Sequence, residues 1–173
     1  MGLTVRGTVV LVAILAALAA YLWAVELKSL PRSLPQPPAL LAVPPAEVAR
    51  LELEGQGQRL TARRIDSGWA DVAGRAWRTG VVSDVLEAVA TLRPIMVIDA
   101  DPAHESDYGL GADATRLRLA AAGGESLLSL EIGDRNPAWT GLYARLAGHR
   151  EVVLVGAVLR WEIEKLREAA PGR

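Results

Sequence analysis

A run of nineteen residues without a formal charge, near the start of the chain, constrains the fold more than any other feature. Residues 7–25 read GTVVLVAILAALAAYLWAV, between Arg6 and Glu26. As a helix rising 1.5 Å per residue, this run is about 28 Å long, close to the roughly 30 Å hydrocarbon core of a bilayer. It predicts a transmembrane helix over residues 7–26, after a leader of residues 1–6. The side chains expected in contact with the lipid bilayer are those of Val9, Leu11, Ile14, Leu18, Tyr21 and Trp23.

The same segment also fits a cleaved secretory signal. Arg6 would supply the positive region, residues 8–16 the apolar region, and residues 17–19 (Ala-Leu-Ala) a cleavage site. We favour retention, because the apolar character continues past this site through Leu22 and Val25. Both interpretations export the rest of the chain. A first hydrophobic segment after so short a leader usually acts as a signal-anchor, which predicts a cytoplasmic N-terminus.

Proline is concentrated in the next segment. Six of the ten prolines lie in residues 31–45, which read PRSLPQPPALLAVPP. Proline fixes φ and lacks an N–H group, so these residues favour extended polyproline II structure over helix. They predict a linker over residues 27–45 that holds the following domain on the order of 45 Å from the anchor. The alternative is a segment that packs on the domain or on a partner through Leu40, Leu41 and Val43.

Apolar and polar residues alternate from residue 47 onward, which is typical of strands. Glycine-containing turns at residues 55–57 and 66–68 separate the first three expected strands. Apolar spacings of three and four residues predict two helices. The expected elements are strands at 47–54, 58–65, 68–72, 94–98, 116–119, 127–132, 142–146 and 151–155, and helices at 81–92 and 158–166.

Strands followed by a helix thus occur twice along the chain. The predicted fold class is α+β: an N-terminal transmembrane helix plus one exported domain, residues 46–169, made of two similar antiparallel-sheet-and-helix halves. Too few residues match between the halves to establish an internal duplication. Residues 170–173 form a short tail.

Composition excludes several classes of function. Nineteen Lys and Arg against twenty Asp and Glu give a net charge of −1, so no overall field attracts nucleic acid. The absence of cysteine excludes disulfides, thiolate metal sites and a cysteine nucleophile. The sequence also lacks a Gly-x-Ser-x-Gly elbow, a Walker lysine motif and a His-Glu-x-x-His motif. We therefore expect a protein that is not an enzyme and needs no cofactor.

An acidic segment is the densest cluster of potential ligands. It contains Asp99, Asp101, His104, Glu105 and Asp107. These oxygens could hold a divalent cation, but their spacing does not match an EF-hand loop. A solvated loop whose Asp side chains cap turns is the favoured interpretation.

Tryptophan supplies the candidate contact residues. The chain has five Trp and no Phe, and Trp77, Trp139 and Trp161 lie near turns or helix starts, where indoles can anchor an interface. Trp139 is the strongest single candidate, although a loop Trp that folds back over the core would fit the sequence at least as well. Trp69 is assigned to the core. Arg63 and Arg64 could add a basic face for an acidic partner, although solvation alone would also explain them.

A set of short motifs resembles one known family. They are Glu47-Val48, Gly68-Trp69, Tyr108-Gly109-Leu110, Leu130-Glu131-Ile132-Gly133, Gly141-Leu142-Tyr143-Ala144-Arg145 and the apolar residues 152–155. In this order, after an N-terminal membrane segment, they resemble the domain-of-unknown-function family numbered four-three-four-zero. That family usually has Asp and then Pro soon after Tyr-Gly-Leu, whereas residues 111–113 here are Gly-Ala-Asp.

The resemblance implies a role and a location. Members are membrane-anchored extracytoplasmic proteins, often linked to gliding-motility-type ABC transporters. It therefore implies a single-pass protein of the bacterial inner membrane, with the C-terminal domain in the periplasm and integral membrane subunits as partners. It brings no catalytic residues.

The leading hypothesis is a non-catalytic accessory or scaffold subunit whose exported domain makes protein–protein contacts. An extracytoplasmic module that binds a glycan or lipid through the Trp-containing loops is the first alternative. A metal-dependent hydrolase built on the acidic segment is the second.

Overall fold

A computed structural model describes residues 5–23, 37–112 and 114–172. The chain divides into two units, residues 1–36 and residues 37–173, which are described separately. The predicted linker residues 27–36 and the end of the predicted membrane segment, residues 24–26, lie outside the described residues.

The first unit contains helix α1, Val5–Tyr21. Leu22 and Trp23 continue it as a π-helical turn, and the side chains of residues 7–23 are exposed throughout. Over the described ranges, no helix has both the length and the apolar character that crossing a membrane requires. The predicted transmembrane segment is therefore not confirmed.

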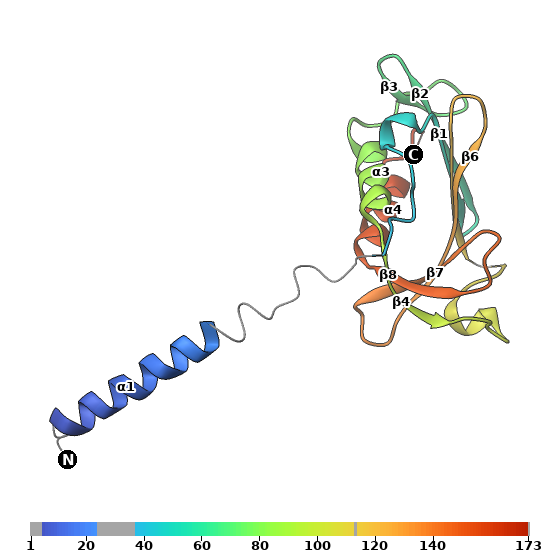
Figure 1. The fold of residues 1–173 in the computed structure, drawn as a ribbon. Coiled ribbons are helices and arrows are strands. Elements are labelled where there is room, and N and C mark those ends of the chain that lie inside the picture. The colour runs from blue at the N-terminus through green and yellow to red at the C-terminus, as the bar shows by residue number, and fades with distance from the viewer. Residues whose placement is uncertain (1–4, 24–36, 113, 173) are drawn as a thin grey trace. The chain divides into compact units, whose positions relative to one another are not determined.

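The second unit is built on an eight-stranded antiparallel sheet with the strand order β3-β2-β1-β5-β6-β7-β8-β4 (Figure 1). The strands are β1 (Arg50–Gly55), β2 (Gln58–Ile65), β3 (Gly68–Ala70), β4 (Pro94–Asp99), β5 (Thr115–Ala120), β6 (Ser126–Arg135), β7 (Gly141–Leu146) and β8 (Val152–Gly156). The alternation, apolar runs and turn signals seen in the sequence predict each of them to within a few residues. The longest, β6, pairs with both β5 and β7, and its register with β7 shifts between Ile132 and Arg135. Such an irregularity bends a strand and increases its twist.

Two helices, α3 (Val81–Thr91) and α4 (Val158–Glu168), lie side by side on one face of this sheet (Figure 1). Their buried residues recur at helical spacing, as in Val82, Val85, Leu86 and Val89 of α3. These side chains and the inward residues of the strands form one hydrophobic core. The predicted helices are confirmed, and the fold class is α+β.

The prediction of two sheet-and-helix halves needs correction. All eight strands belong to a single sheet, and β4 lies at its far edge beside β8, although it follows the first helix in sequence. Strand pairing over such a sequence distance leaves no local signature, because the apolar runs of β4 and β8 are the same whichever strands they join.

Residues 37–45 pack on the domain. Leu41 is 4% exposed in the core, and Leu40 and Val43 are partly buried against it. The Leu40 amide donates to the Leu92 carbonyl at 2.9 Å, and the Arg93 guanidinium donates to the Pro37 carbonyl at 2.7 Å. For residues 37–45 the packed alternative is correct. The rest of the predicted linker lies outside the described residues.

Candidate interaction surfaces

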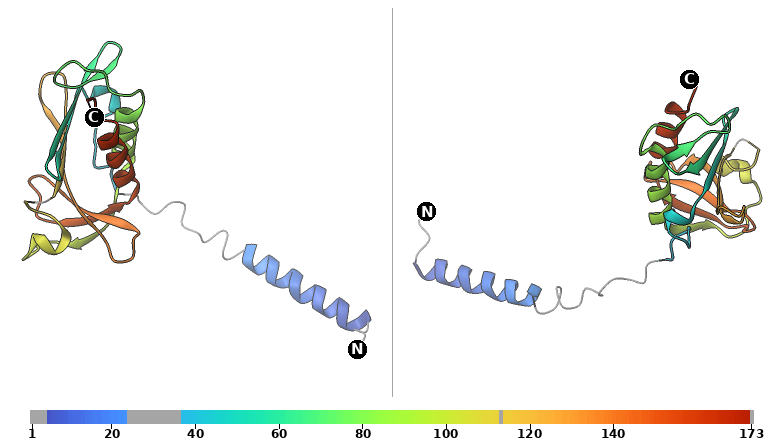
Figure 2. Two further views of the ribbon diagram at one scale, coloured as in Figure 1. Left: turned by 180° about the vertical axis from the view of Figure 1, so that it is seen from behind. Right: turned by 90° about the horizontal axis from the view of Figure 1, so that it is seen from above.

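Several of the motif residues, among them Tyr108, Glu131 and Arg145, meet on the sheet face opposite the two helices. A short 3-10 helix, η3 (Glu105–Tyr108), lies on that face (Figure 2). Gly109 ends η3 in the left-handed conformation, with φ of 66°. Gly133 of β6 has no side chain, and a Cβ atom there would overlap the Tyr108 carbonyl oxygen. The two glycines thus allow η3 to lie directly on β6.

Ion pairs hold η3 against the strands. Arg145 of β7 donates to Glu131 of β6 at 2.6 Å and to Glu105 of η3 at 2.9 Å. Arg116 of β5 donates to the other oxygen of Glu131 at 3.1 Å and to the Gly111 carbonyl at 2.6 Å. The side chains of Arg145 and Glu131 are only 15% and 20% exposed. A network this shielded from water is costly to break at one member.

The charges shift one another's titration. The hydrogen bonds between Glu105 and Arg145 lower the pKa of the Glu105 carboxyl. The same contact raises the pKa of Arg145 above its usual range. Arg145 therefore stays charged, and Glu105 stays ionised to a lower pH than a free glutamate.

Two tyrosines complete the contact. The rings of Tyr108 and Tyr143 meet edge to face, with centroids 5.1 Å apart. The Tyr108 hydroxyl donates to the Asp99 carboxylate at 2.9 Å, and this hydrogen bond raises the pKa of Tyr108. The end of β4 is thereby tied to η3.

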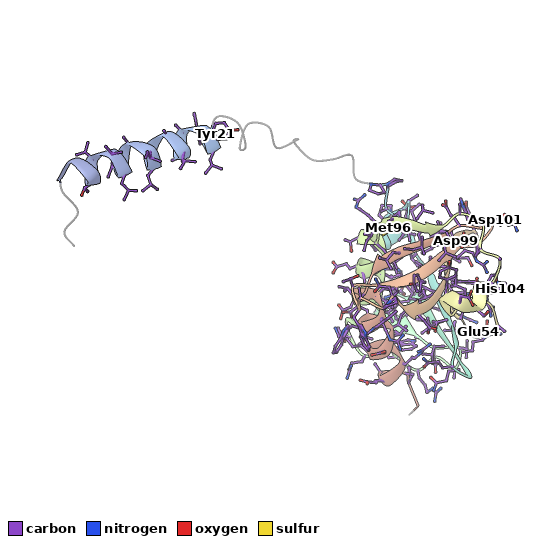
Figure 3. The ribbon with its side chains drawn as sticks, turned by 90° about the horizontal axis from the view of Figure 1, so that it is seen from below. Tyr21, Glu54, Met96, Asp99, Asp101 and His104 are labelled. Carbon is purple, nitrogen blue, oxygen red and sulfur yellow. The ribbon has the colours of Figure 1, made fainter. Side chains whose placement is uncertain are left out.

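Three carboxylates of the acidic segment make contacts within the domain. Besides Asp99 and Glu105, Asp101 pairs with Arg150 at 2.8 Å, and both side chains are largely exposed. Figure 3 shows Asp99, Asp101 and His104 along one side of the domain. In the part of the chain that the structure describes, no three His, Asp or Glu side chains are grouped so that they could hold a metal ion.

Glu105→Gln is expected to lower the melting temperature at neutral pH, because the amide loses the ion pair with Arg145. Since the folded-state pKa is depressed, this stabilisation is present above the unfolded glutamate pKa of about 4.3 and is lost as the pH falls through the lower folded value. The difference between variant and wild type should therefore shrink below about pH 4 in thermal melts. Glu125→Gln, in an exposed hairpin turn, is the control. A gap that persisted in acid would contradict the ion-pair account.

Trp139 is held outward by the turn between β6 and β7. The Asn136 side-chain oxygen accepts hydrogen bonds from the Thr140 and Gly141 amides, at 2.9 and 3.0 Å. The turn places Trp139 at φ of 61° and leaves it 70% exposed. A large residue in the left-handed region is strained, and such strain is concentrated at binding sites.

A shallow hollow of about 520 Å³ lies beside this indole, lined by Asp134, Arg135, Trp139, Arg160 and Glu164. The Arg135 guanidinium stacks over the Trp139 ring, with its carbon 5.1 Å from the centroid. The Nε atom of Arg135 is buried and has no hydrogen-bond acceptor among the described residues. Trp and Arg are both enriched at protein interfaces. We call these five residues the Trp139 surface.

The other predicted tryptophans differ in exposure. Trp161 of α4 is 62% exposed and shares a helix face with Val158, which is 65% exposed. It does not line the hollow beside Trp139. The prediction of Trp77 as a contact residue is wrong. Its side chain is 6% exposed in the core and donates to the Thr61 carbonyl at 3.2 Å. Trp69 is in the core, as predicted.

The two predicted arginines, Arg63 and Arg64, differ in their contacts. Arg64 donates to the Val48 and Pro45 carbonyls at 2.9 and 3.0 Å and stacks on Trp69, so it fastens the start of the domain. Its guanidinium is therefore used within the domain. Arg63 is exposed on β2, opposite Arg50 of β1.

Sequence reasoning missed Arg135 and Arg160 of the Trp139 surface. Arg135 stands four residues before Trp139. This spacing does not predict a contact between the two side chains unless the turn at Asn136 is known. Arg160 comes from α4, and only the folded domain brings it to the same hollow.

Comparison with known proteins gives one match. The sequence profile described as "Domain of unknown function (DUF4340)" matches residues 82–168, from α3 to the end of α4. No curated protein and no solved structure matches the chain. The matched region contains η3, the Arg145 network and the Trp139 surface, and it covers slightly more than half of the 173 residues. The chain therefore belongs to the DUF4340 family.

Proposed function

We propose that this protein is a single-pass, membrane-anchored accessory or scaffold subunit of a bacterial inner-membrane complex. The domain stands in the periplasm and makes protein–protein contacts without catalysing a reaction. Its partners are integral membrane subunits, and an ABC transporter of the kind linked to this family is the expected assembly.

The apolar helix supports the anchor. Residues 7–23 carry no charge, and large side chains such as Val9, Ile14 and Leu18 are more than half exposed. Exposed apolar area is unfavourable in water by about 25 cal/mol per Å². A lipid environment removes that cost, and Tyr21 and Trp23 at one end suit the membrane–water boundary.

The Trp139 surface carries the scaffold proposal. The Trp139 backbone is held at a positive φ, and its indole projects from the domain, where the Arg135 guanidinium stacks over it. Burial of such a side chain at an interface contributes about 2 kcal/mol or more, and Trp and Arg are the residues that most often do this.

Trp139→Ala is expected to remove the membrane partners from the full-length protein purified in mild detergent. The loss of about 2 kcal/mol corresponds to roughly a thirtyfold weaker complex. The measurement is the yield of co-purified subunits, with Val72→Ala as the matched control, because Val72 is 67% exposed elsewhere on the domain. Unchanged melting of the Trp139 variant would show that binding, not folding, was lost. Full co-purification with the variant, or a wild type that always runs without a partner, contradicts the proposal.

A ligand-binding module remains the alternative, because the hollow beside Trp139 offers an aromatic face and charged groups. Thermal-shift measurements with glycans and lipids distinguish the two functions, since a ligand that binds the native state raises its melting temperature. A shift that Trp139→Ala abolishes would favour the module over the scaffold.

The anchor has its own test. Wild type is expected to stay with membranes in alkaline carbonate. The double variant Leu11→Lys and Ile14→Lys should be released, because each lysine costs about 3 kcal/mol at the bilayer centre. Ile14→Val is the control and should stay with the membranes. A mature chain that begins at Ala20 would show cleavage instead of anchoring.

A further inference from the structure

The two edge strands of the sheet differ in length and in how they are covered. Strand β3, at one edge, has three residues, and a bridge between Ala70 and Ala76 turns the chain back over its end. Strand β4, at the other edge, has six residues, and in the part of the chain that is described it pairs with β8 alone. One edge is thus closed by its own chain, and the other is left open.

The open edge is apolar. Four successive residues of β4 are exposed: Ile95 by 58%, Met96 by 55%, Val97 by 52% and Ile98 by 37%. Register shifts against β8 on either side of the Met96–Val97 pair break the usual alternation, which explains why no member of the run turns inward. A long apolar edge invites pairing with another chain, and proteins that remain monomeric usually blunt such edges with charges or short strands.

Charges at the two ends of β4 indicate what covers it. Arg93 precedes the strand, and Asp99 and Asp101 follow the apolar run. When two copies of this segment lie antiparallel, Arg93 of each copy faces the acidic end of the other copy. The apolar run of each copy then faces the apolar run of the other. A parallel copy would place like charges together.

These charged groups have capacity left for such a contact. Arg93 uses one nitrogen to donate to Pro37, out of five N–H donors. Asp99 accepts two hydrogen bonds, from the Tyr108 hydroxyl and the Asp101 amide, and a carboxylate can accept about four. Figure 3 shows Met96 and Asp99 near each other on the same side of the domain.

We propose that β4 is a dimer interface, in which the strand packs antiparallel on β4 of a second copy of this chain. The two-fold axis passes near Met96 and Val97, so each copy presents the same patch to the other. The interface shares no residue with the Trp139 surface, and it does not depend on which membrane partner is bound.

The first test is the mass of the full-length protein, produced apart from its membrane partners and purified in mild detergent, by light scattering with the detergent subtracted. Wild type is expected to show twice the chain mass, and Met96→Glu the mass of one chain, because two carboxylates would face each other near the axis. Val72→Glu is the matched control, since it places the same charge at an exposed apolar residue outside β4 and should leave the dimer intact.

The second test does not depend on a destabilising variant. The chain has no cysteine, so a single Met96→Cys supplies the only thiol. Mild oxidation should join two such chains through a disulfide far faster than it joins Val72→Cys chains. A monomeric wild type, equal cross-linking at both positions, or Met96→Cys cross-linked in membranes to a different protein would each overturn the proposal. Loss of the membrane partners in Trp139→Ala with the dimer retained would separate this interface from the scaffold contact.

Discussion

Gly133→Ala is expected to lower the free energy of unfolding by about 3 kcal/mol. The new Cβ would overlap the Tyr108 carbonyl oxygen and approach the Gly109 backbone at 3.0 Å, so η3 must lift from β6. Backbone atoms on both sides leave no flexible side chain to give way. Denaturant unfolding of the full-length protein in mild detergent measures the change.

Gly156→Ala is the matched control for this prediction. Gly156 lies at the end of β8, and a Cβ there would meet nothing within 4 Å. Its effect should stay within about 0.5 kcal/mol. If both alanines cost the same, the close contact between η3 and β6 is not what stabilises this face.

Arg145→Ala is expected to cost about 2 kcal/mol, because it leaves Glu131 partly buried with one cation fewer. We place the cost below that of a fully buried pair, since some 15–20% of each side chain still meets water. Arg118→Ala, whose pairing with Glu54 at 3.6 Å is exposed, should change stability by less than about 0.5 kcal/mol. A cycle with Glu131→Ala measures the coupling, and additive effects would contradict the network.

Local patterns in the sequence predict most of the secondary structure. Alternation defines β5 around residues 116–119, and spacings of three and four define α3, because burying one face of an element requires that periodicity. These signals are local, so they can be recognised in the sequence without knowledge of the fold. They do not predict that β4 joins β8 at the far edge, since pairing is decided by the whole core.

The site is less visible in the sequence for the same reason. Trp139 stands out as an exposed indole, but its partner Arg135 and its neighbour Arg160 meet only in the folded domain. Trp77 lies near a turn, as Trp139 does, yet its ring fills the core. The acidic segment resembles a ligand set in composition, whereas Arg145, a distant residue, is what Glu105 binds.

The motifs that mark the family acquire a physical role in this fold. Tyr108-Gly109 needs Gly133 opposite it, Glu131 needs Arg145, and Tyr143 packs on Tyr108. They fasten η3 to the sheet and leave the turn that carries Trp139 projecting from the domain. These contacts fix η3 on the sheet next to the strand that leads into the Trp139 turn.

Site-specific photocross-linking in intact cells tests this contact most directly. A photoreactive residue at Ala138, which is exposed beside Trp139, is expected to form a covalent adduct with an integral membrane protein, whereas the same residue at Val72 is not. Adducts from Ala138 that contain no membrane protein, or identical adducts from both positions, would contradict the scaffold function.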